Sequence, residues 1–238
     1  MKLLRRVVRN LILEFIHPKI DSMIERLVAR KDPSRGRFPK VIIYTGRVET
    51  RVVVYNGVST SARIDAKVPD PVTKKWKGFC NNSWRVYQAQ AKRELGPLAY
   101  EVLMEYATLN GGALVSDRTQ LSPEAFNVWQ KYLERSLAEG DVEALQLDWY
   151  DVPQAGRLTP EYEDDDCEHG TSETYYYKAN PGVKSVAYYD KDEKDWRVDP
   201  NYKDYWLNND PLAKAYRKSP NSTMKKLEAL GMLEIRKG

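Results

Sequence analysis

The segment Ala91–Glu105, AKRELGPLAYEVLME, joins two hydrophobic patterns of different period. The residues before it, SWRVYQAQA, alternate in the manner of a strand. After Gly96 the apolar residues follow helical spacing, and Pro97 suits the first position of a helix. The segment is therefore predicted to connect a strand to a helix. Its function depends on whether this turn only links two elements or also binds an anion at the helix N-terminus.

The chain begins with a basic helical pattern. Apolar residues recur in adjacent pairs four positions apart over residues 3–16, and a second amphipathic helix is predicted after His17-Pro18. Residues 1–53 carry 13 Lys or Arg against five Asp or Glu. We therefore predict a basic amphipathic helical arm over residues 1–38.

The apolar stripe of this arm has several possible neighbours. It is able to pack on its own domain, dock into a protein partner or lie on a membrane surface. Packing on protein is favoured, because the stripe continues into the second helix and contains no Trp. Nucleic-acid binding is disfavoured, since no aromatic residues are interleaved in the basic stretch.

The centre of the chain mixes strands and helices. Strands are predicted at 41–48, 50–57 and 58–68, with Asn56-Gly57 as a hairpin turn. A helix over 97–109 closed by NGG, a strand ALVSD, a helix beginning at Pro123 after the N-cap Ser122, and a strand from Val142 follow. This order predicts an α/β domain over residues 39–155.

Residues 156–238 differ in character from the domain. The tract is rich in Tyr and acidic residues and has little regular period, so we predict an irregular extension that is nevertheless ordered, because disordered segments are poor in aromatics. A short helix capped by Ser222 or Thr223 and closed by Gly231 is predicted to pack on the domain. Cys167-Glu168-His169 lacks the further ligands that zinc needs, and no metal site is predicted.

The whole chain sets broad limits. No run approaches the roughly 20 apolar residues of a membrane-spanning helix, so no transmembrane segment is expected. The two cysteines lie far apart in sequence, which favours a reducing compartment.

The order of predicted elements resembles that of the GNAT superfamily of acyl-CoA-dependent N-acyltransferases, over roughly residues 40–150. The GPLAY turn, and SDR followed by SPEA, are similar to GNAT-like proteins of bacteriophages. The resemblance implies a GNAT-like mixed central sheet flanked by helices. It also implies acetyl-CoA or another acyl-CoA as cosubstrate, and transfer of the acyl group to an amine of a small molecule or protein.

Members of that family bind the CoA pyrophosphate at the turn of the form Gln/Arg-x-x-Gly-x-Gly/Ala after the central strand. The resemblance implies cofactor contacts from seven residues around this turn: Gln88, Ala89, Gln90, Lys92, Arg93, Leu95 and Gly96. It also implies that a strand N–H near Gln88 polarises the thioester carbonyl.

Acid and base groups follow from the same resemblance. Trp129 occupies the place of a Tyr that protonates the thiolate in many members, so Tyr132, one turn further on, is the candidate donor. Candidate proton acceptors are Glu49, Asp117 and Glu105.

Two residues of the turn depart from the family pattern. Ala91 stands where Gln or Arg is usual, and Glu94 stands where the first Gly is usual. These departures, with Trp129, leave an alternative function open: a non-catalytic GNAT-fold structural or interaction protein, such as a phage virion component. The protein is accordingly expected in the cytoplasm or incorporated in a virion.

Overall fold

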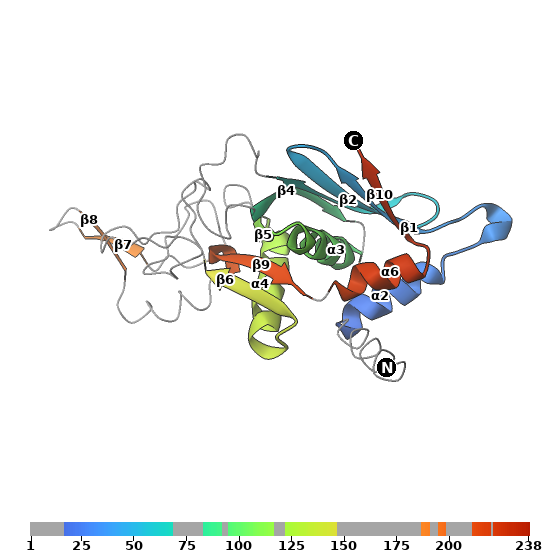
Figure 1. Cartoon of the computed structure of the whole chain (residues 1–238). Helices are drawn as coiled ribbons and strands as arrows, with labels where there is room; N and C mark the ends of the chain where they lie inside the picture. The colour runs from blue at the N-terminus through green and yellow to red at the C-terminus, as the bar shows by residue number, and fades with distance from the viewer. Residues whose placement is uncertain are drawn as a thin grey trace, which may run out of the picture. The chain divides into compact units, whose positions relative to one another are not determined.

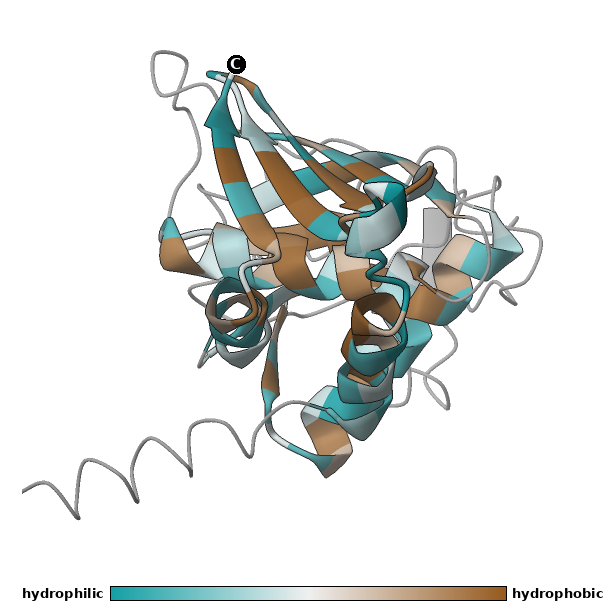
Figure 2. Cartoon of the chain, turned by 90° about the vertical axis from the view of Figure 1, so that its right-hand side faces the viewer, coloured by the Kyte–Doolittle hydropathy of each residue, from teal (hydrophilic) through white to brown (hydrophobic). Residues whose placement is uncertain are grey.

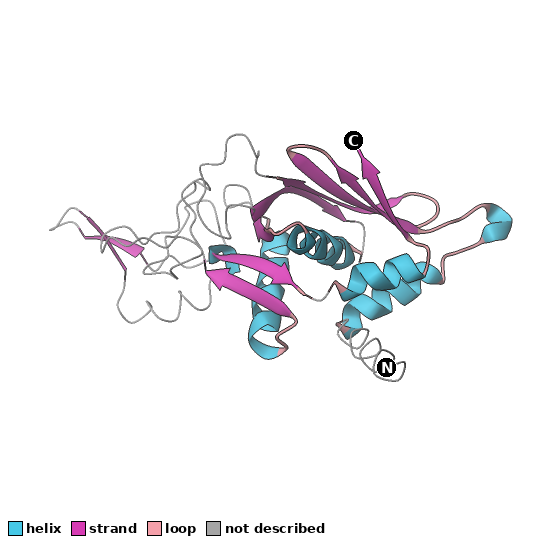
Figure 3. Cartoon of the chain, in the orientation of Figure 1, coloured by secondary structure: helices cyan, strands magenta, loops and turns pink. Residues whose placement is uncertain are grey.

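The fold is α/β. The computed structural model describes residues 17–68, 83–91, 95–116, 122–146, 187–190, 195–198, 211–219 and 221–238. They form an open mixed sheet of eight strands in the order β10-β1-β2-β3-β4-β5-β9-β6, a separate two-stranded sheet and four α-helices (Figure 3). The first helix expected in the arm, over residues 3–16, lies outside the described residues.

The elements have the following bounds. The helices are α2 (Pro18–Val28), α3 (Gly96–Leu109), α4 (Pro123–Ala138) and α6 (Ser222–Ala229), with short 3-10 segments η1 (Pro33–Arg35) and η3 (Pro211–Ala213). The strands are β1 (Lys40–Thr45), β2 (Glu49–Tyr55), β3 (Thr60–Lys67), β4 (Ser83–Ala91), β5 (Ala113–Ser116), β6 (Val142–Gln146), β7 (Ala187–Asp190), β8 (Asp195–Val198), β9 (Lys214–Lys218) and β10 (Leu233–Lys237).

The chain divides into two compact units, each of which is described by itself. Unit 1 comprises Met1–Val68, Val86–Asn110 and Lys218–Gly238. Unit 2 comprises Pro69–Arg85 and Gly111–Arg217.

Unit 1 is built on an antiparallel meander of β1, β2 and β3. The predicted hairpin turn is confirmed: the Asn56 side chain accepts hydrogen bonds from two backbone N–H groups of the turn, and Gly57 has a φ of 90° that favours glycine. β10 adds to the other edge of β1 in parallel, with Val41 opposite Leu233.

One face of this sheet forms the core of unit 1. Buried side chains alternate with half-exposed ones along β2. Figure 2 shows hydrophobic and hydrophilic residues following one another along the strands. The buried set faces α3 and includes Val41, Ile43, Val52, Val54 and Ile64. α2 and α6 pack beside α3 on the same side of the sheet (Figure 1), joined by an ion pair between Asp21 and Lys226. Burial of Ile20, Met23, Ile24 and Leu27 confirms most of the predicted apolar face of α2, whereas Val28, expected on the same face, is exposed.

Unit 2 contains α4 packed on β6 and η3, with β9 paired antiparallel to β5. The predicted N-cap of α4 is confirmed, since Ser122 Oγ accepts a hydrogen bond from the Ala125 N–H at 3.2 Å. Trp129, predicted to be a core aromatic, is fully buried.

Three predictions need correction. The N-cap of α6 is Asn221 rather than Ser222 or Thr223. A strand, β10, follows this helix and was not predicted. The tract predicted to be irregular contributes β7, β8 and β9. The sequences of β9 and β10, KAYRK and LEIRK, are each only five residues long and rich in charge, so their strand character depends on pairing with distant parts of the chain.

Candidate functional site

The connection between β4 and α3 is the predicted cofactor turn. Exposure increases along the end of β4, from half-buried Gln88 to exposed Ala89, Gln90 and Ala91. Five predicted contact residues are described: Gln88, Ala89, Gln90, Leu95 and Gly96. The other two, Lys92 and Arg93, lie outside the described residues, as does Glu94.

The N-terminus of α3 has the polarity that an anion requires. Leu95 occupies the N-cap position, so no side-chain cap bonds to the first turn, and the first turn contains no acidic residue. Pro97 has no N–H, and the Ala99 N–H reaches the Leu95 carbonyl oxygen only at 3.3 Å. The positive end of the helix dipole is therefore not offset by a carboxylate of its own first turn.

Gly96 has a structural reason to lack a side chain. A Cβ added at this position would stand 3.0 Å from the Cβ of Ala91. The end of β4 and the start of α3 thus approach each other so closely that a methyl group on both residues would make an unusually tight contact, which one of them must relieve by shifting. A small residue is needed here whether or not the turn binds a ligand.

Replacing Gly96 with Ala is expected to lower the free energy of unfolding by about 1–3 kcal/mol, because the new methyl group overpacks this contact. The variant Gly96→Ala/Ala91→Gly removes the opposing methyl group and should recover most of the loss. Urea denaturation of the two variants and the wild type measures both effects. An equal loss in the double variant would contradict the contact as the cause.

Glu105, a predicted proton acceptor, lies inside unit 1. It and Glu101 are one turn apart on α3, and both are fully buried. The Nζ atom of Lys218 lies 2.8 Å from Glu101 Oε1 and 2.6 Å from Glu105 Oε1. Lys218 is itself almost fully buried, so the three side chains form an ion cluster in the core.

The Glu105 carboxylate also caps α6. Its Oε1 accepts from the Thr223 N–H at 3.0 Å, and its Oε2 accepts from the Met224 N–H at 2.7 Å. These N–H groups belong to the first turn of α6, whose own N-cap makes no side-chain bond. The hydroxyls of Ser222 and Thr223, which were predicted to cap the helix, instead accept hydrogen bonds from Lys218 at 3.3 Å.

Burial and charge pairing act in opposite directions on this cluster. Burial raises the pKa of Glu105, against the lowering effect of Lys218 and the two N–H groups. Burial works to lower the pKa of Lys218, but Glu101 and Glu105 together outweigh it and raise that pKa. The lysine therefore remains a cation, because two carboxylates lie within hydrogen-bonding distance of one ammonium group.

Tyr132, the predicted proton donor, is buried in unit 2. Its ring lies 6.3 Å from that of Trp129 and 6.0 Å from that of Tyr216, centroid to centroid. Trp129 and Tyr216 stack at 5.5 Å, and the Tyr216 hydroxyl donates to the Pro211 carbonyl oxygen at 2.8 Å. The guanidinium of Arg135, which is paired with Asp141, lies over the Tyr132 ring. These contacts hold Tyr132 in an aromatic core.

The other two predicted proton acceptors are Glu49 and Asp117, and the structure does not show either of them beside Glu105. Glu49 begins β2, is half-buried and lies opposite Lys67 in the sheet register. Asp117 lies outside the described residues. Within unit 1, the described contacts of Glu105 are to Lys218 and α6, so the structure does not bring it together with Glu49.

The sequence reasoning missed Glu101 and Lys218. One signal was available: Glu101 and Glu105 are four residues apart within a helix that is otherwise almost entirely apolar. Nothing near them in sequence identified Lys218 as their partner.

A metal site and a membrane-spanning helix are two further features that these residues could form. In the part of the chain that the structure describes, no group of three or more His, Cys, Asp or Glu side chains is placed to hold a metal ion. No described helix is both long enough and apolar enough to cross a membrane. Comparison with known proteins gave no matching family model, no similar curated protein and no similar solved structure.

Proposed function

We propose that this protein binds acyl-CoA at the β4–α3 turn and transfers the acyl group to an amine, as an N-acyltransferase of the GNAT type. The observation that carries the proposal is the turn itself. An exposed strand end leads into a 14-residue helix whose first turn has neither a side-chain cap nor a carboxylate. A pyrophosphate is stabilised where helix N–H groups and the positive end of the dipole converge.

The order of elements supports the same function. The expected succession of antiparallel strands, β4, α3, β5, α4 and β6 is present along the chain. Gln88 and Gln90 lie near the exposed end of β4, the place from which a backbone N–H would polarise a thioester carbonyl in the proposed reaction. The thioester of acyl-CoA supplies the activated acyl group. Because Glu105 is occupied by Lys218 and α6, Glu49, Asp117 or water is the better proton acceptor.

Acetyl-CoA binding is the direct test. If free acetyl-CoA is 100-fold above its Kd, the native state should gain about 2.7 kcal/mol, which a thermal shift detects. Pro97→Glu places a carboxylate in the first turn of α3 and should weaken binding about tenfold through repulsion of the pyrophosphate. Pro123→Glu, which replaces the proline in the first turn of α4, is the control and should leave binding unchanged.

Calorimetry at millimolar acetyl-CoA provides the second readout. Absence of both heat and thermal shift would rule out this function. Equal weakening by the two Pro variants would remove the α3 turn as the binding site.

A non-catalytic role is the second candidate, and a specific observation favours it. Two predicted catalytic side chains, Glu105 and Tyr132, are buried in packing contacts of units 1 and 2 respectively. A protein that keeps these residues for stability alone would be a structural or interaction protein, such as a phage virion component. Its presence at a fixed copy number in purified particles, together with no acetyl-CoA binding, would establish this role.

A further inference from the structure

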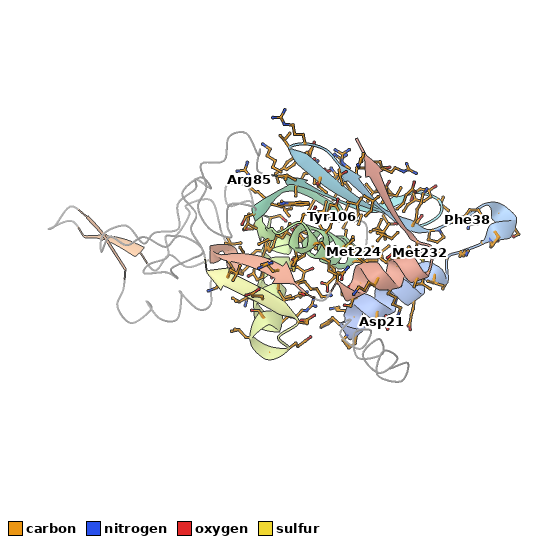
Figure 4. The ribbon with its side chains drawn as sticks, in the orientation of Figure 1. Asp21, Phe38, Arg85, Tyr106, Met224 and Met232 are labelled. Carbon is orange, nitrogen blue, oxygen red and sulfur yellow. The ribbon has the colours of Figure 1, made fainter. Side chains whose placement is uncertain are left out.

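The sheet of unit 1 has a second face, opposite α3, which is mostly polar and partly accessible. We call it the outer face and define it by the outward residues of β1, β2, β3 and β10. In Figure 4 side chains project from this side of the sheet as well as toward α3. Eight charged residues on it follow from the strand register: Lys40, Glu49, Arg51, Arg63, Asp65, Lys67, Glu234 and Arg236. Five are cations and three are carboxylates, so the face has a positive balance.

Asp65 holds two of these cations in place. Its side chain is fully buried and pairs with Arg51, from the neighbouring strand, through one oxygen. Its other oxygen accepts from Arg63 Nε at 2.7 Å. Both guanidinium groups bind Asp65 through Nε, and their side chains remain 37% and 33% exposed. The other N–H groups of each guanidinium, beyond Nε, are donors of the kind that suits a phosphate.

Aromatic rings lie between the charges. Tyr44 is next to Arg51 in the register on one side and Arg236 on the other, and the Arg236 guanidinium lies 5.7 Å from its ring centroid. Lys67 Nζ lies 5.5 Å from the ring centroid of Tyr87 on β4. Tyr44 and Tyr87 are both half-exposed. The face therefore combines fixed cations with partly accessible rings.

We propose that the outer face binds single-stranded nucleic acid. Phosphates would contact Arg51 and Arg63, whose geometry Asp65 fixes before binding, and bases would stack on Tyr44. Stacking on aromatic side chains together with a cationic surface is how proteins bind single strands without reading sequence. A binding mode of this kind uses no 2′-hydroxyl, so RNA and DNA of equal length should bind alike.

The same residues disfavour other partners. A membrane surface would require several apolar side chains that protrude, whereas the accessible residues here are mostly charged residues and tyrosines, with half-exposed Val53 among them. An acidic protein segment would use the cations but would not require the rings. Nucleic acid was disfavoured because aromatics are not interleaved within the basic segment of the sequence, whereas the sheet brings Tyr44 of β1 and Tyr87 of β4 beside cations of β2, β3 and β10.

Fluorescence anisotropy of a labelled 20-nucleotide oligothymidine with the full chain tests the proposal. The variant Arg51→Gln/Arg63→Gln/Asp65→Asn removes two positive charges and one negative charge and leaves no buried charge unpaired. Its matched control is Lys131→Gln on α4, which also lowers the net charge by one and is exposed. The triple variant should lose binding by about tenfold or more, and the control should bind almost as the wild type does.

Salt dependence gives a more specific readout. For single strands the slope of log affinity against log salt concentration is about −0.7 per phosphate contact, so loss of two contacts should make it shallower by about 1.4. Tyr44→Leu should weaken binding without changing the slope, because it removes stacking but no charge. Melting curves of every variant verify that the fold is intact.

Three outcomes would overturn the proposal. The first is no oligothymidine binding by the wild type at 50 mM salt. The second is equal loss in the triple variant and Lys131→Gln, which would indicate only a net-charge effect. The third is binding to phosphatidylserine vesicles, lost in the triple variant, with no binding to the oligonucleotide.

Discussion

Replacing Lys218 with Met is expected to lower the free energy of unfolding by about 3–5 kcal/mol, because it leaves two buried carboxylates without a cation. Lys218 is 1% exposed, and Glu101 and Glu105 are both fully buried. At this chain length each kcal/mol corresponds to about 2–4 °C in Tm. Guanidinium denaturation and thermal melting both measure the loss.

Two further variants test whether the loss of stability in Lys218→Met comes from the buried ion cluster. Lys225→Met removes an exposed lysine of α6 and should change stability by no more than about 0.5 kcal/mol. Adding Glu101→Gln to Lys218→Met should recover part of the loss, since one of the two unpaired charges is then absent. An equal effect of Lys218→Met and Lys225→Met would contradict a buried cluster.

The pH dependence of the Lys218→Met effect has a defined sign. The pKa of Lys218 is raised in the folded state above its ordinary 10.5. Its stabilising contribution is therefore fully present below about pH 10.5 and is lost as the pH rises through the folded-state pKa. In the wild type this contribution should be constant from pH 7 to 9 and shrink at more alkaline pH. In the variant, Glu105 has lost the cation that lowers its pKa against burial, so the variant should gain stability as the pH falls and the buried carboxylates take up protons. The difference between wild type and variant should therefore be smaller at acidic pH, and a difference that grows as the pH falls would contradict this assignment.

Replacing Trp129 with Ala is expected to cost about 3–5 kcal/mol, as for other buried aromatic residues. The side chain is fully buried and stacks on Tyr216 at 5.5 Å. Trp129→Phe keeps a ring in the cluster and should cost clearly less. Leu137→Ala, on the same helix but 69% exposed, is the control and should change stability by no more than about 0.5 kcal/mol. A small loss in Trp129→Ala would contradict the packing seen around β9.

Elements with a strong local signal were predictable from the sequence. The β2–β3 turn depends on Asn56-Gly57, and the start of α4 depends on the Ser122 hydroxyl. In both cases the polar side chain bonds to a backbone N–H no more than three residues further along the chain. β9 and β10 have no comparable signal. Their strand character depends on β5 and β1, which lie far away in the chain.

The candidate site was predictable only in part, for the same reason. The strand-to-helix turn at Gly96 follows from local periodicity, and its place between β4 and α3 is confirmed. The environment of Glu105 does not follow, because its partner Lys218 lies 113 positions later. Helix spacing places Glu105 on α3 but does not show which face of α3 is covered by α6.

The parallel pairing of β10 with β1 has a consequence for synthesis. β1 leaves the ribosome early, but its edge partner includes residues up to Lys237, and α3 obtains Lys218 and α6 only shortly before. The core of unit 1 therefore cannot close while translation of these residues is still in progress. Until then β1 presents an unpaired edge, and contacts between segments so distant in sequence form slowly. Unit 1 is thus expected to complete its folding only after β10 has been synthesised, and until then the growing chain can bind chaperones or associate with other copies.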